Sequence, residues 1–204
     1  MLGGMDARQT TVSRSPELMS AVDTALLVVD VQERLIGAIA GHERIVWNAR
    51  RLIDGAKLLG LPVVATEQYP AGLGPTVAEL RERVGPIPSK RSFSCAGCPE
   101  ALTALAHQDV RHPVHKVLVC GIEAHVCVQQ TVLDLMAAGW RIYVAVDAIG
   151  SRFAVDYETA LRRMDSAGAT LTTTEAALFE WCQSSAAPEF EQISRLVREV
   201  VASD

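Results

Sequence analysis

Residues 116–139 read KVLVCGIEAHVCVQQTVLDLMAAG, and this stretch decides the fold. KVLVC (116–120) is an apolar run typical of a buried parallel strand, and VQQTVLDLMAAG (128–139) is amphipathic with helical spacing. Between them, GIEAHVC (121–127) places a Gly, a Glu, a His and a Cys where the strand turns into the helix. Such turns line the crevice beyond the carboxyl ends of parallel strands, where ligands bind. The stretch therefore predicts a strand-helix unit with functional groups at its turn.

The same alternation runs along most of the chain. HERIVWNARRLIDGAKLLG (42–60) has apolar residues three or four positions apart, which predicts an amphipathic helix that stops at Gly60, before Pro62. Alternating strands and helices form right-handed βαβ units with a mostly parallel sheet covered on both faces. The predicted strands, all rich in β-branched residues, are ALLVVDVQ (25–32), LPVVATEQ (61–68), KVLVCGI (116–122), RIYVAVDAI (141–149) and ATLTTTE (169–175).

Two internal segments are rich in Gly, Pro or Ser. YPAGLGPT (69–76) is predicted to be a loop, and VGPIPSKRSFSCAGCP (84–99) is predicted to be irregular or a short edge strand. With 204 residues the chain suits one domain with a full core. We expect a mobile N-terminal arm over residues 1–18 and a single domain over residues 19–204.

Composition limits the classes of function. The chain is 49% apolar and 21% charged, with a net charge of -5 and no long Lys/Arg cluster, which argues against nucleic-acid binding. No apolar run approaches the roughly 18 residues of a membrane span, and the first twenty residues lack the apolar core of a signal peptide. The five cysteines are odd in number and sparse, which predicts reduced thiols. We expect a cytoplasmic protein that binds a small molecule and neither nucleic acid nor a membrane.

Three predicted strands end in polar groups that packing does not require. Asp30 ends the first strand, Glu67 and Gln68 end the second, and GIEAHVC (121–127) follows the third. If these strands are neighbours, their carboxyl ends meet at one edge of the sheet and the polar groups converge on one crevice.

Cys127 is the candidate nucleophile. In the first turn of its helix, unpaired N–H groups and the helix dipole would lower the thiol pKa; an inert buried thiol is the alternative, and it fits Cys120 in the strand. His125 is two residues away, so on a helix it points about 200° from Cys127, and a dyad of the two is not expected. Asp30 and Lys90 are better partners, although a capping carboxylate and a solvated lysine are the alternative interpretations.

The motif CAGC (95–98) offers a second chemistry. A C-x-x-C before a helix-like segment, here PEALTALAHQ (99–108), is how redox-active dithiols are built. The preceding βα unit of a thioredoxin is missing. A zinc site would add His107 and His112, but eight residues separate Cys98 from His107, fewer than in the usual finger. We expect no zinc site, and a redox role of Cys95 and Cys98 is kept as an alternative.

Together the motifs resemble the isochorismatase-like cysteine hydrolase superfamily, which includes nicotinamidases and N-carbamoylsarcosine amidohydrolases, and within it the branch of isochorismatase domain-containing proteins. They occur in the family's order and span nearly the whole chain after the arm. The motifs are LLVVDVQERL (26–35), RLIDGAKLLGLPVVATEQYPAGLGPTVAEL (51–80), KRSFSC (90–95), VLVCGIEAHVCVQQTVLDLMAAG (117–139), VAVDAIGSR (144–152) and LTTTEAALFE (171–180).

The resemblance implies a three-layer α/β fold with a six-stranded parallel sheet of order 3-2-1-4-5-6. It implies a catalytic triad, which falls on Asp30, Lys90 and Cys127. It also implies a cis peptide bond in the turn, here at Ile122-Glu123.

The same resemblance gives the turn a chemical role. The backbone N–H groups of Glu123 and Cys127 would form an oxyanion hole, and Gly121 and Ile122 would shape the turn. The side chains of Glu123 and His125 would lie on its rim, outside the catalytic set.

Departures from the family pattern bear on the substrate. Nicotinamidases carry an Asp-x-His and a further His as a metal site after the second strand, whereas this chain has no His between residues 43 and 106, so we expect neither a metal nor another cofactor. Isochorismatases that cleave an enol ether often lack the cysteine, so Cys127 favours amide chemistry. Gln68, Tyr69 and Phe93 are the expected pocket walls.

The predicted function is therefore a metal-independent cysteine hydrolase of the amidohydrolase type, acting on a small-molecule amide or related C–N bond through a thioacyl intermediate on Cys127. The family also implies a homo-oligomer, a dimer or larger. The alternatives are a catalytically silent scaffold with the same fold and a thiol redox protein that uses Cys95 and Cys98.

Overall fold

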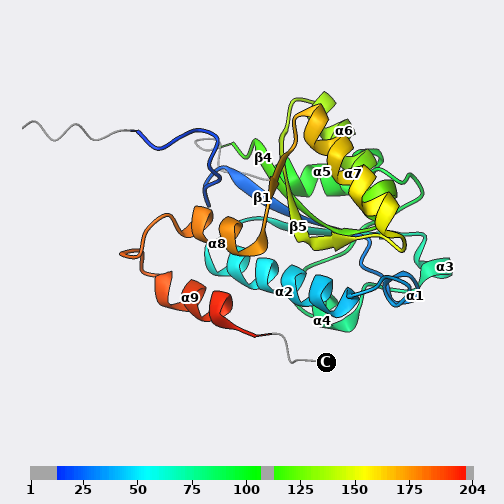
Figure 1. Cartoon of the computed structure of the whole chain (residues 1–204), viewed down its shortest axis with the longest axis horizontal. Coiled ribbons are helices and arrows are strands. Elements are labelled where there is room, and N and C mark those ends of the chain that lie inside the picture. Colours follow the sequence, from blue (N-terminus) through cyan, green and yellow to red (C-terminus); the bar gives the residue numbers. More distant parts are fainter. Residues whose placement is uncertain (1–12, 107–112, 201–204) are drawn as a thin grey trace, which may run out of the picture.

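The computed structural model describes residues 13–106 and 113–200. It has three layers, with one sheet between two layers of helices (Figure 1). The six strands pair in the order β3-β2-β1-β4-β5-β6, all in parallel, which confirms the predicted fold and strand order. The strands are β1 (Thr24–Val29), β2 (Val63–Gln68), β3 (Ser89–Lys90), β4 (Lys116–Ile122), β5 (Arg141–Gly150) and β6 (Thr170–Thr172).

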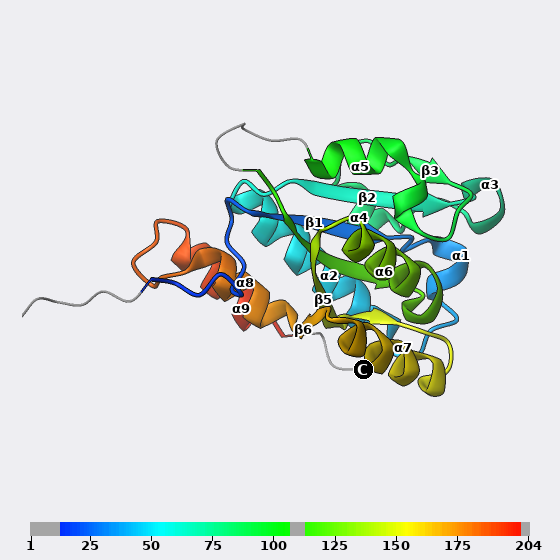
Figure 2. The same cartoon turned by 90° about the horizontal axis from the view of Figure 1, so that it is seen from above.

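The helices divide between the two faces of the sheet. In Figure 1, α2, α8 and α9 lie on one side of the strands and α5, α6 and α7 on the other. Figure 2 shows the sheet from above, from β3 and β2 at one edge to β6 at the other. The helices are α1 (Glu33–Ile36), α2 (His42–Leu58), α3 (Pro70–Leu73), α4 (Ala78–Arg81), α5 (Pro99–Ala106), α6 (Gln129–Ala137), α7 (Ala154–Ala167), α8 (Thr174–Cys182) and α9 (Phe190–Arg198), with a 3-10 turn at Cys95–Gly97 and a π-helical turn at Ala124–Val128.

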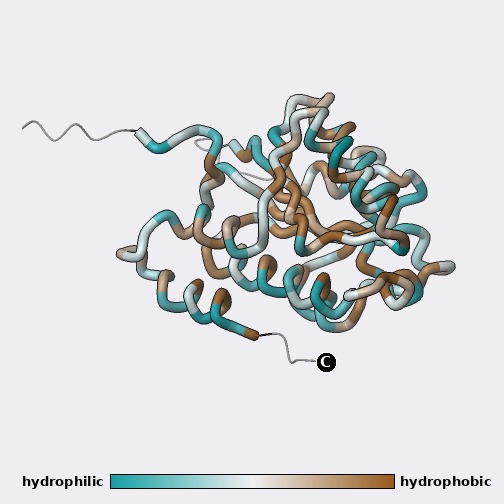
Figure 3. Tube along the Cα trace, viewed as in Figure 1, coloured by the Kyte–Doolittle hydropathy of each residue, from teal (hydrophilic) through white to brown (hydrophobic). Residues whose placement is uncertain are grey.

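Strand β1 shows how both faces of the sheet are buried. Successive side chains of a strand point to opposite faces, so Leu26 and Val28 join the core on the α2 side while Leu27 and Val29 join the core on the α5 and α6 side. Burying each such side chain stabilises the fold by about 1.5–3 kcal/mol. Figure 3 shows the hydrophobic residues gathered along the strands between the two helical layers.

Helix α2 agrees with its prediction over 42–60 and ends slightly earlier. Its apolar side faces the sheet and α8. Gly55 lies on that side, where an added Cβ would be 2.2 Å from a methyl carbon of Leu178, so the two helices can approach closely only because this residue has no side chain.

Of the two irregular segments, 69–76 differs from its prediction and 84–99 agrees with it. The predicted loop 69–76 contains the single-turn helix α3, because Pro70 stands at a first-turn position, where its fixed φ suits a helix. The segment 84–99 contains the two-residue edge strand β3.

The described part of the predicted arm is bonded to the domain. Arg14 donates to the carbonyls of Met19 at 2.7 Å and Glu180 at 2.8 Å, and Lys116 Nζ donates to the Leu18 carbonyl at 2.8 Å. Residues 1–12 of the arm lie outside the described residues. Within residues 13–106 and 113–200, none of the helices is long and apolar enough to cross a membrane.

Candidate active site

The carboxyl ends of neighbouring strands gather the polar residues that the sequence singled out. β1 pairs with β2 on one side and with β4 on the other. Asp30 follows β1 directly, Gln68 ends β2, and the π turn follows β4. Asp30 has a φ of 51°, a left-handed conformation that Asp adopts more readily than most residues, and it bends the chain away from the sheet at this point.

Asp30 and Lys90 form a buried ion pair at this edge. Lys90 Nζ lies 2.6 Å from Asp30 Oδ2, and both side chains are fully buried. The ammonium also donates to Gln68 Oε1 at 3.1 Å and to the carbonyls of Ser92 at 3.2 Å and Phe93 at 2.7 Å. A buried charge is tolerated when it is paired and hydrogen-bonded in this way. Lys90 is therefore no surface lysine, and Asp30 caps no helix.

The second oxygen of Asp30 is bonded to Thr66, a residue that sequence reasoning missed. Thr66 Oγ1 donates to Asp30 Oδ1 at 2.8 Å and lies 3.4 Å from Cys95 Sγ. Since the hydroxyl has one proton and gives it to Asp30, it accepts from the Cys95 thiol. Burial raises the pKa of Cys95 to about 11, so the thiol keeps its proton. Cys95 thus lies beside the carboxylate as part of a hydrogen-bond chain.

Cys127 lies in the π turn and not in the first turn of an α-helix, because α6 starts two residues later, at Gln129. Cys127 is 6% exposed. Burial raises the pKa of the Cys127 thiol above its usual range; the Asp30 carboxylate raises the pKa further, whereas the Lys90 ammonium lowers it. The expectation of a lowered pKa was wrong, because Cys127 lies before the α-helix and burial raises the pKa of its thiol.

Gly121 determines how closely the turn approaches β1. Its φ is 121°, and an added Cβ would lie 2.1 Å from the carbonyl oxygen of Val29. Only glycine fits there. The peptide bond Ile122-Glu123 is cis. The Glu123 carbonyl then accepts the N–H groups of Val126 at 3.1 Å and Val128 at 3.2 Å, which closes the turn around Cys127.

The three expected pocket walls differ in their surroundings. Gln68 is 9% exposed and belongs to the buried network, since its Oε1 binds Lys90 and its Nε2 donates to the Arg91 carbonyl at 2.9 Å. Tyr69 and Phe93 are 42% and 53% exposed. The Arg91 guanidinium lies 4.0 Å from the centre of the Tyr69 ring. Gln68 therefore supports the ion pair, and the two aromatic residues face outward.

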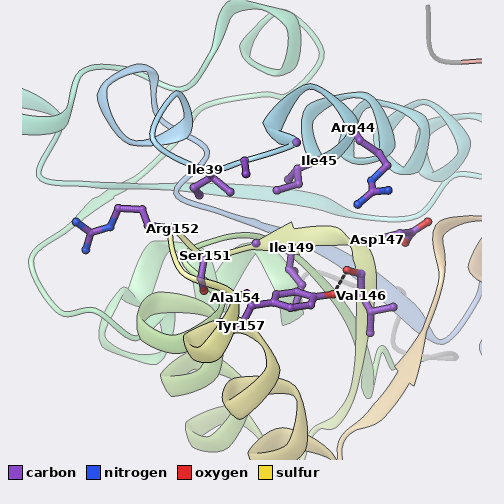
Figure 4. A pocket seen from close by; sticks show the side chains of 13 residues that line it. Ile39, Arg44, Ile45, Val146, Asp147, Ile149, Ser151, Arg152, Ala154 and Tyr157 are labelled. Carbon is purple, nitrogen blue, oxygen red and sulfur yellow. Dashed lines mark hydrogen bonds between the residues drawn. The ribbon is translucent and has the colours of Figure 1, made fainter. Parts of the chain in front are cut away.

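A cavity of about 220 Å³ lies between the starts of α2 and α7, beyond the carboxyl end of β5 (Figure 4). The hydroxyl of Tyr157 donates to the Val146 carbonyl at 2.7 Å on one wall. None of the triad residues lines it. The lining residues are Ile39, Ala40, Gly41, Arg44, Ile45, Val146, Asp147, Ile149, Gly150, Ser151, Arg152, Ala154 and Tyr157.

The structure gives little support to the redox and zinc interpretations of the CAGC motif. CAGC forms a 3-10 turn in which Cys95 is fully buried and Cys98 is 2% exposed. All five cysteines are free thiols. In the part of the chain that the structure describes, no cluster of three or more His, Cys, Asp or Glu side chains could hold a metal ion. His107 and His112 of the zinc alternative lie outside the described residues.

Two further residues of the site were missed by sequence reasoning. Ser151 and Arg152 contact the side chains of His125 and Glu123. Thr66 carried a usable signal, because it stands one position before Glu67 in a predicted strand end. Ser151 and Arg152 end the family motif VAVDAIGSR (144–152), but the motif does not show their contacts, which join segments far apart in the sequence.

Comparisons with known proteins show the family and the fold of the chain. The isochorismatase domain model matches residues 24–176. The chain is 40% identical over 178 residues to isochorismatase domain-containing protein 2 of Homo sapiens, covering 86% of this chain and 83% of that protein. The structure of MAR1 ribonuclease from Caenorhabditis elegans superposes with a TM-score of 0.82 at 38% identity, over 92% of this chain and 95% of that one. The YcaC gene product of Escherichia coli, at 23% identity, shares the fold with a TM-score of 0.80, over 90% of this chain and 91% of that one.

Proposed function

The chain belongs to the isochorismatase family, and from that premise we propose that it is a cysteine hydrolase that cleaves the C–N bond of a small amide. Cys127 is the nucleophile in this proposal, and Asp30 moves its proton. The observation that carries the proposal is the buried ion pair of Asp30 and Lys90, 2.6 Å apart, whose charges both act on the Cys127 thiol. Core packing gives no reason to bury such a pair beside a thiol.

The first half of the reaction forms a thioester. Asp30 accepts the thiol proton as the Cys127 sulfur attacks the amide carbon, and the carbonyl electrons move to the oxygen. The backbone N–H groups of Glu123 and Cys127 donate to this oxyanion. When the intermediate collapses, the C–N bond breaks and Asp30 returns the proton to the leaving nitrogen. The amine departs, and the acyl group stays on sulfur.

The second half releases the acid. Asp30 takes a proton from a water molecule, whose oxygen attacks the thioester carbon. The C–S bond breaks, and the sulfur regains a proton from Asp30. One amide and one water thus give one carboxylic acid and one amine, with Cys127 and Asp30 restored.

Lys90 stabilises the negatively charged form of both Asp30 and Cys127. Its ammonium pairs with Asp30 when the carboxylate is charged, and it lowers the pKa of Cys127. Lys90 thus supplies one positive charge beside the negative charge, whether that charge stands on the Asp30 carboxylate or, after proton transfer, on the Cys127 sulfur.

We also propose a homo-oligomer of two or more subunits. Large apolar side chains are exposed on the described surface, among them Phe93 at 53%, Phe153 at 61% and Val155 at 66%. Phe153 and Val155 are close in the sequence, and exposed apolar residues that form one patch mark interaction sites. Light scattering during size-exclusion chromatography tests this, and a monomer at micromolar concentration contradicts it.

A panel of small uncharged amides tests the proposed function, with release of ammonia or amine as the readout. We expect hydrolysis by the wild-type protein and none by Cys127→Ala. Cys182→Ala, which changes a cysteine of α8, is the matched control and should keep the wild-type rate. Hydrolysis that survives in Cys127→Ala contradicts the mechanism, and a protein that hydrolyses no amide supports the scaffold alternative.

RNA and a disulfide substrate complete the panel. RNA is included because the C. elegans protein is described as a ribonuclease. Cleavage of RNA that does not depend on Cys127 would replace the amide proposal. Disulfide reduction that Cys95→Ser abolishes would favour the redox alternative.

A further inference from the structure

Two polar side chains beside Cys127, those of Glu123 and His125, take no part in the proposed reaction, and both reach the junction between β5 and α7. Glu123 Oε1 accepts hydrogen bonds from the Arg152 backbone N–H at 3.2 Å and from Arg152 Nε at 3.0 Å. His125 Nδ1 lies 2.9 Å from Ser151 Oγ. These two contacts, Glu123 with Arg152 and His125 with Ser151, are called the α7 latch below.

The latch acts on the main chain that carries Cys127. The Glu123 carbonyl accepts the N–H groups of Val126 and Val128, the two residues on either side of Cys127. Glu123 is thus bonded to both neighbours of the nucleophile through its carbonyl and to Arg152 through its side chain. A shift of Glu123 would carry Cys127 with it, and misplacement of a reacting group by about 1 Å costs up to roughly a hundredfold in rate.

Burial makes Glu123 dependent on its partner. The Glu123 side chain is 10% exposed, whereas that of Arg152 is 51% exposed. A nearly buried carboxylate needs hydrogen-bond donors, and Arg152 supplies two. Truncating Arg152 removes the Nε donor and keeps the backbone donor, so it weakens the latch without exposing a new core surface.

The cavity of Figure 4 lies next to the latch residues. Ser151 and Arg152 line it together with Ile39 and Ile45 from the opposite wall. Because no side chain of the described residues fills this space of about 220 Å³, close packing does not fix Ser151 and Arg152 from that side. The strand pairing with β4 ends at Gly150, just before them, and the hydrogen bonds of the latch then tie Ser151 and Arg152 to the π turn.

We propose that Arg152 is a positioning residue that fixes Cys127 through Glu123, with the His125–Ser151 contact as a second tie. The effect on turnover rests on the proposed function; the effect on the turn does not. When the latch is weakened, the π turn shifts relative to Asp30. Hydrolysis then slows, while Cys127 becomes more accessible to small reagents.

Arg152→Ala tests the proposal against Arg162→Ala, which removes an exposed arginine of α7 whose guanidinium donates to Thr159 Oγ1 within the same helix. For Arg152→Ala we expect kcat to fall by about ten- to a hundredfold with KM nearly unchanged. Labelling of Cys127 by iodoacetamide should become faster. Arg152→Lys restores a side-chain donor and should recover part of kcat. Arg162→Ala should match the wild type in each measurement.

Cys120, fully buried in β4, separates local movement from general loosening. Faster labelling of Cys127 with Cys120 still protected supports the latch. Labelling of both cysteines at equally raised rates, or wild-type values for kcat and for Cys127 labelling, overturns it. If the wild-type protein hydrolyses no amide, the proposed function fails, and the labelling of Cys127 in Arg152→Ala still decides the latch.

Discussion

Cys120 and Cys127 lie on the same strand-turn unit, yet their surroundings differ. Cys120 is 0% exposed and Cys127 is 6% exposed, and burial raises the pKa of both thiols. Cys120 packs in the core on the α2 side, where the charge of Asp147 raises its pKa further. Cys127 faces both Asp30 and Lys90. Exposure therefore does not distinguish a core cysteine from a candidate nucleophile; a cation and a carboxylate beside the sulfur do.

Gly121→Ala should prevent the fold that gives Cys120 and Cys127 their different surroundings. The new Cβ would lie 2.1 Å from the Val29 carbonyl oxygen, so β1 and β4 could no longer pair at the turn. We expect no folded protein, or a free energy of unfolding lower by more than about 4 kcal/mol, measured with urea. Gly139→Ala is the control, because Gly139 also has a positive φ but has open space around its Cβ position. Equal losses in both variants would mean that the close approach to Val29 does not matter.

Lys90→Gln should make the Cys127 thiol less reactive, and so more like the thiol of Cys120. Removing the ammonium leaves the Asp30 carboxylate buried and unpaired, which costs about 3–5 kcal/mol of stability. Since Lys90 lowers the pKa of Cys127, its loss raises that pKa, and iodoacetamide should label Cys127 more slowly at fixed pH. Urea denaturation and peptide-resolved labelling measure the two effects. An unchanged labelling rate in a folded variant would show that Lys90 does not act on the thiol.

Asp30→Asn should have the opposite effect and make the Cys127 thiol more reactive. The carboxylate raises the pKa of Cys127, so the neutral amide lowers it. Labelling of Cys127 near neutral pH should become about tenfold faster for each unit by which its pKa falls, with Cys120 unaffected. Hydrolysis of amides should nevertheless stop, because no group is left to protonate the leaving nitrogen. A variant that labels faster and still hydrolyses would remove Asp30 from the mechanism.

Asp23→Asn should change the stability of the protein at acid pH without changing the reactivity of Cys120 or Cys127. Burial by itself would raise the pKa of Asp23, but hydrogen bonds from Lys116, Thr24 and Ser20 outweigh it and hold the pKa below its usual value of 3.8. The stability gained is therefore present above pH 3.8 and is lost as the pH falls through the lower folded pKa. We expect the variant to lose about 1 kcal/mol or less at pH 7 and to show a flatter acid limb in urea titrations. The same acid limb in both proteins would contradict this.

The fold could be predicted from the sequence because its signals are local. The apolar run 116–120 and the helical spacing of 42–60 each report on adjacent residues, and the rules for parallel sheets then leave few topologies. The loop prediction for 69–76 was wrong at α3, because one helical turn started by Pro70 needs no apolar periodicity.

The site could be predicted only in part, because its contacts join distant residues. Asp30 and Cys127 could be placed at strand ends, and Lys90 was singled out through the family resemblance. The bond from Thr66 to Asp30 spans 36 residues and that from Arg152 to Glu123 spans 29, so neither could be predicted. The pKa of Cys127 was predicted in the wrong direction, since burial of its thiol depends on tertiary packing that a helix position does not reveal.

Trapping the acyl group during turnover tests most directly whether Cys127 is the nucleophile. An amide that the wild-type protein hydrolyses is mixed with it, quenched with acid and analysed by peptide mass spectrometry. Cys120 and Cys127 both lie between Lys116 and Arg141, in one tryptic peptide, so fragmentation must assign the added mass. We expect the acyl group on Cys127 and none in Cys127→Ala; an acyl group on Cys95, or steady hydrolysis with no acylated cysteine, would contradict the mechanism.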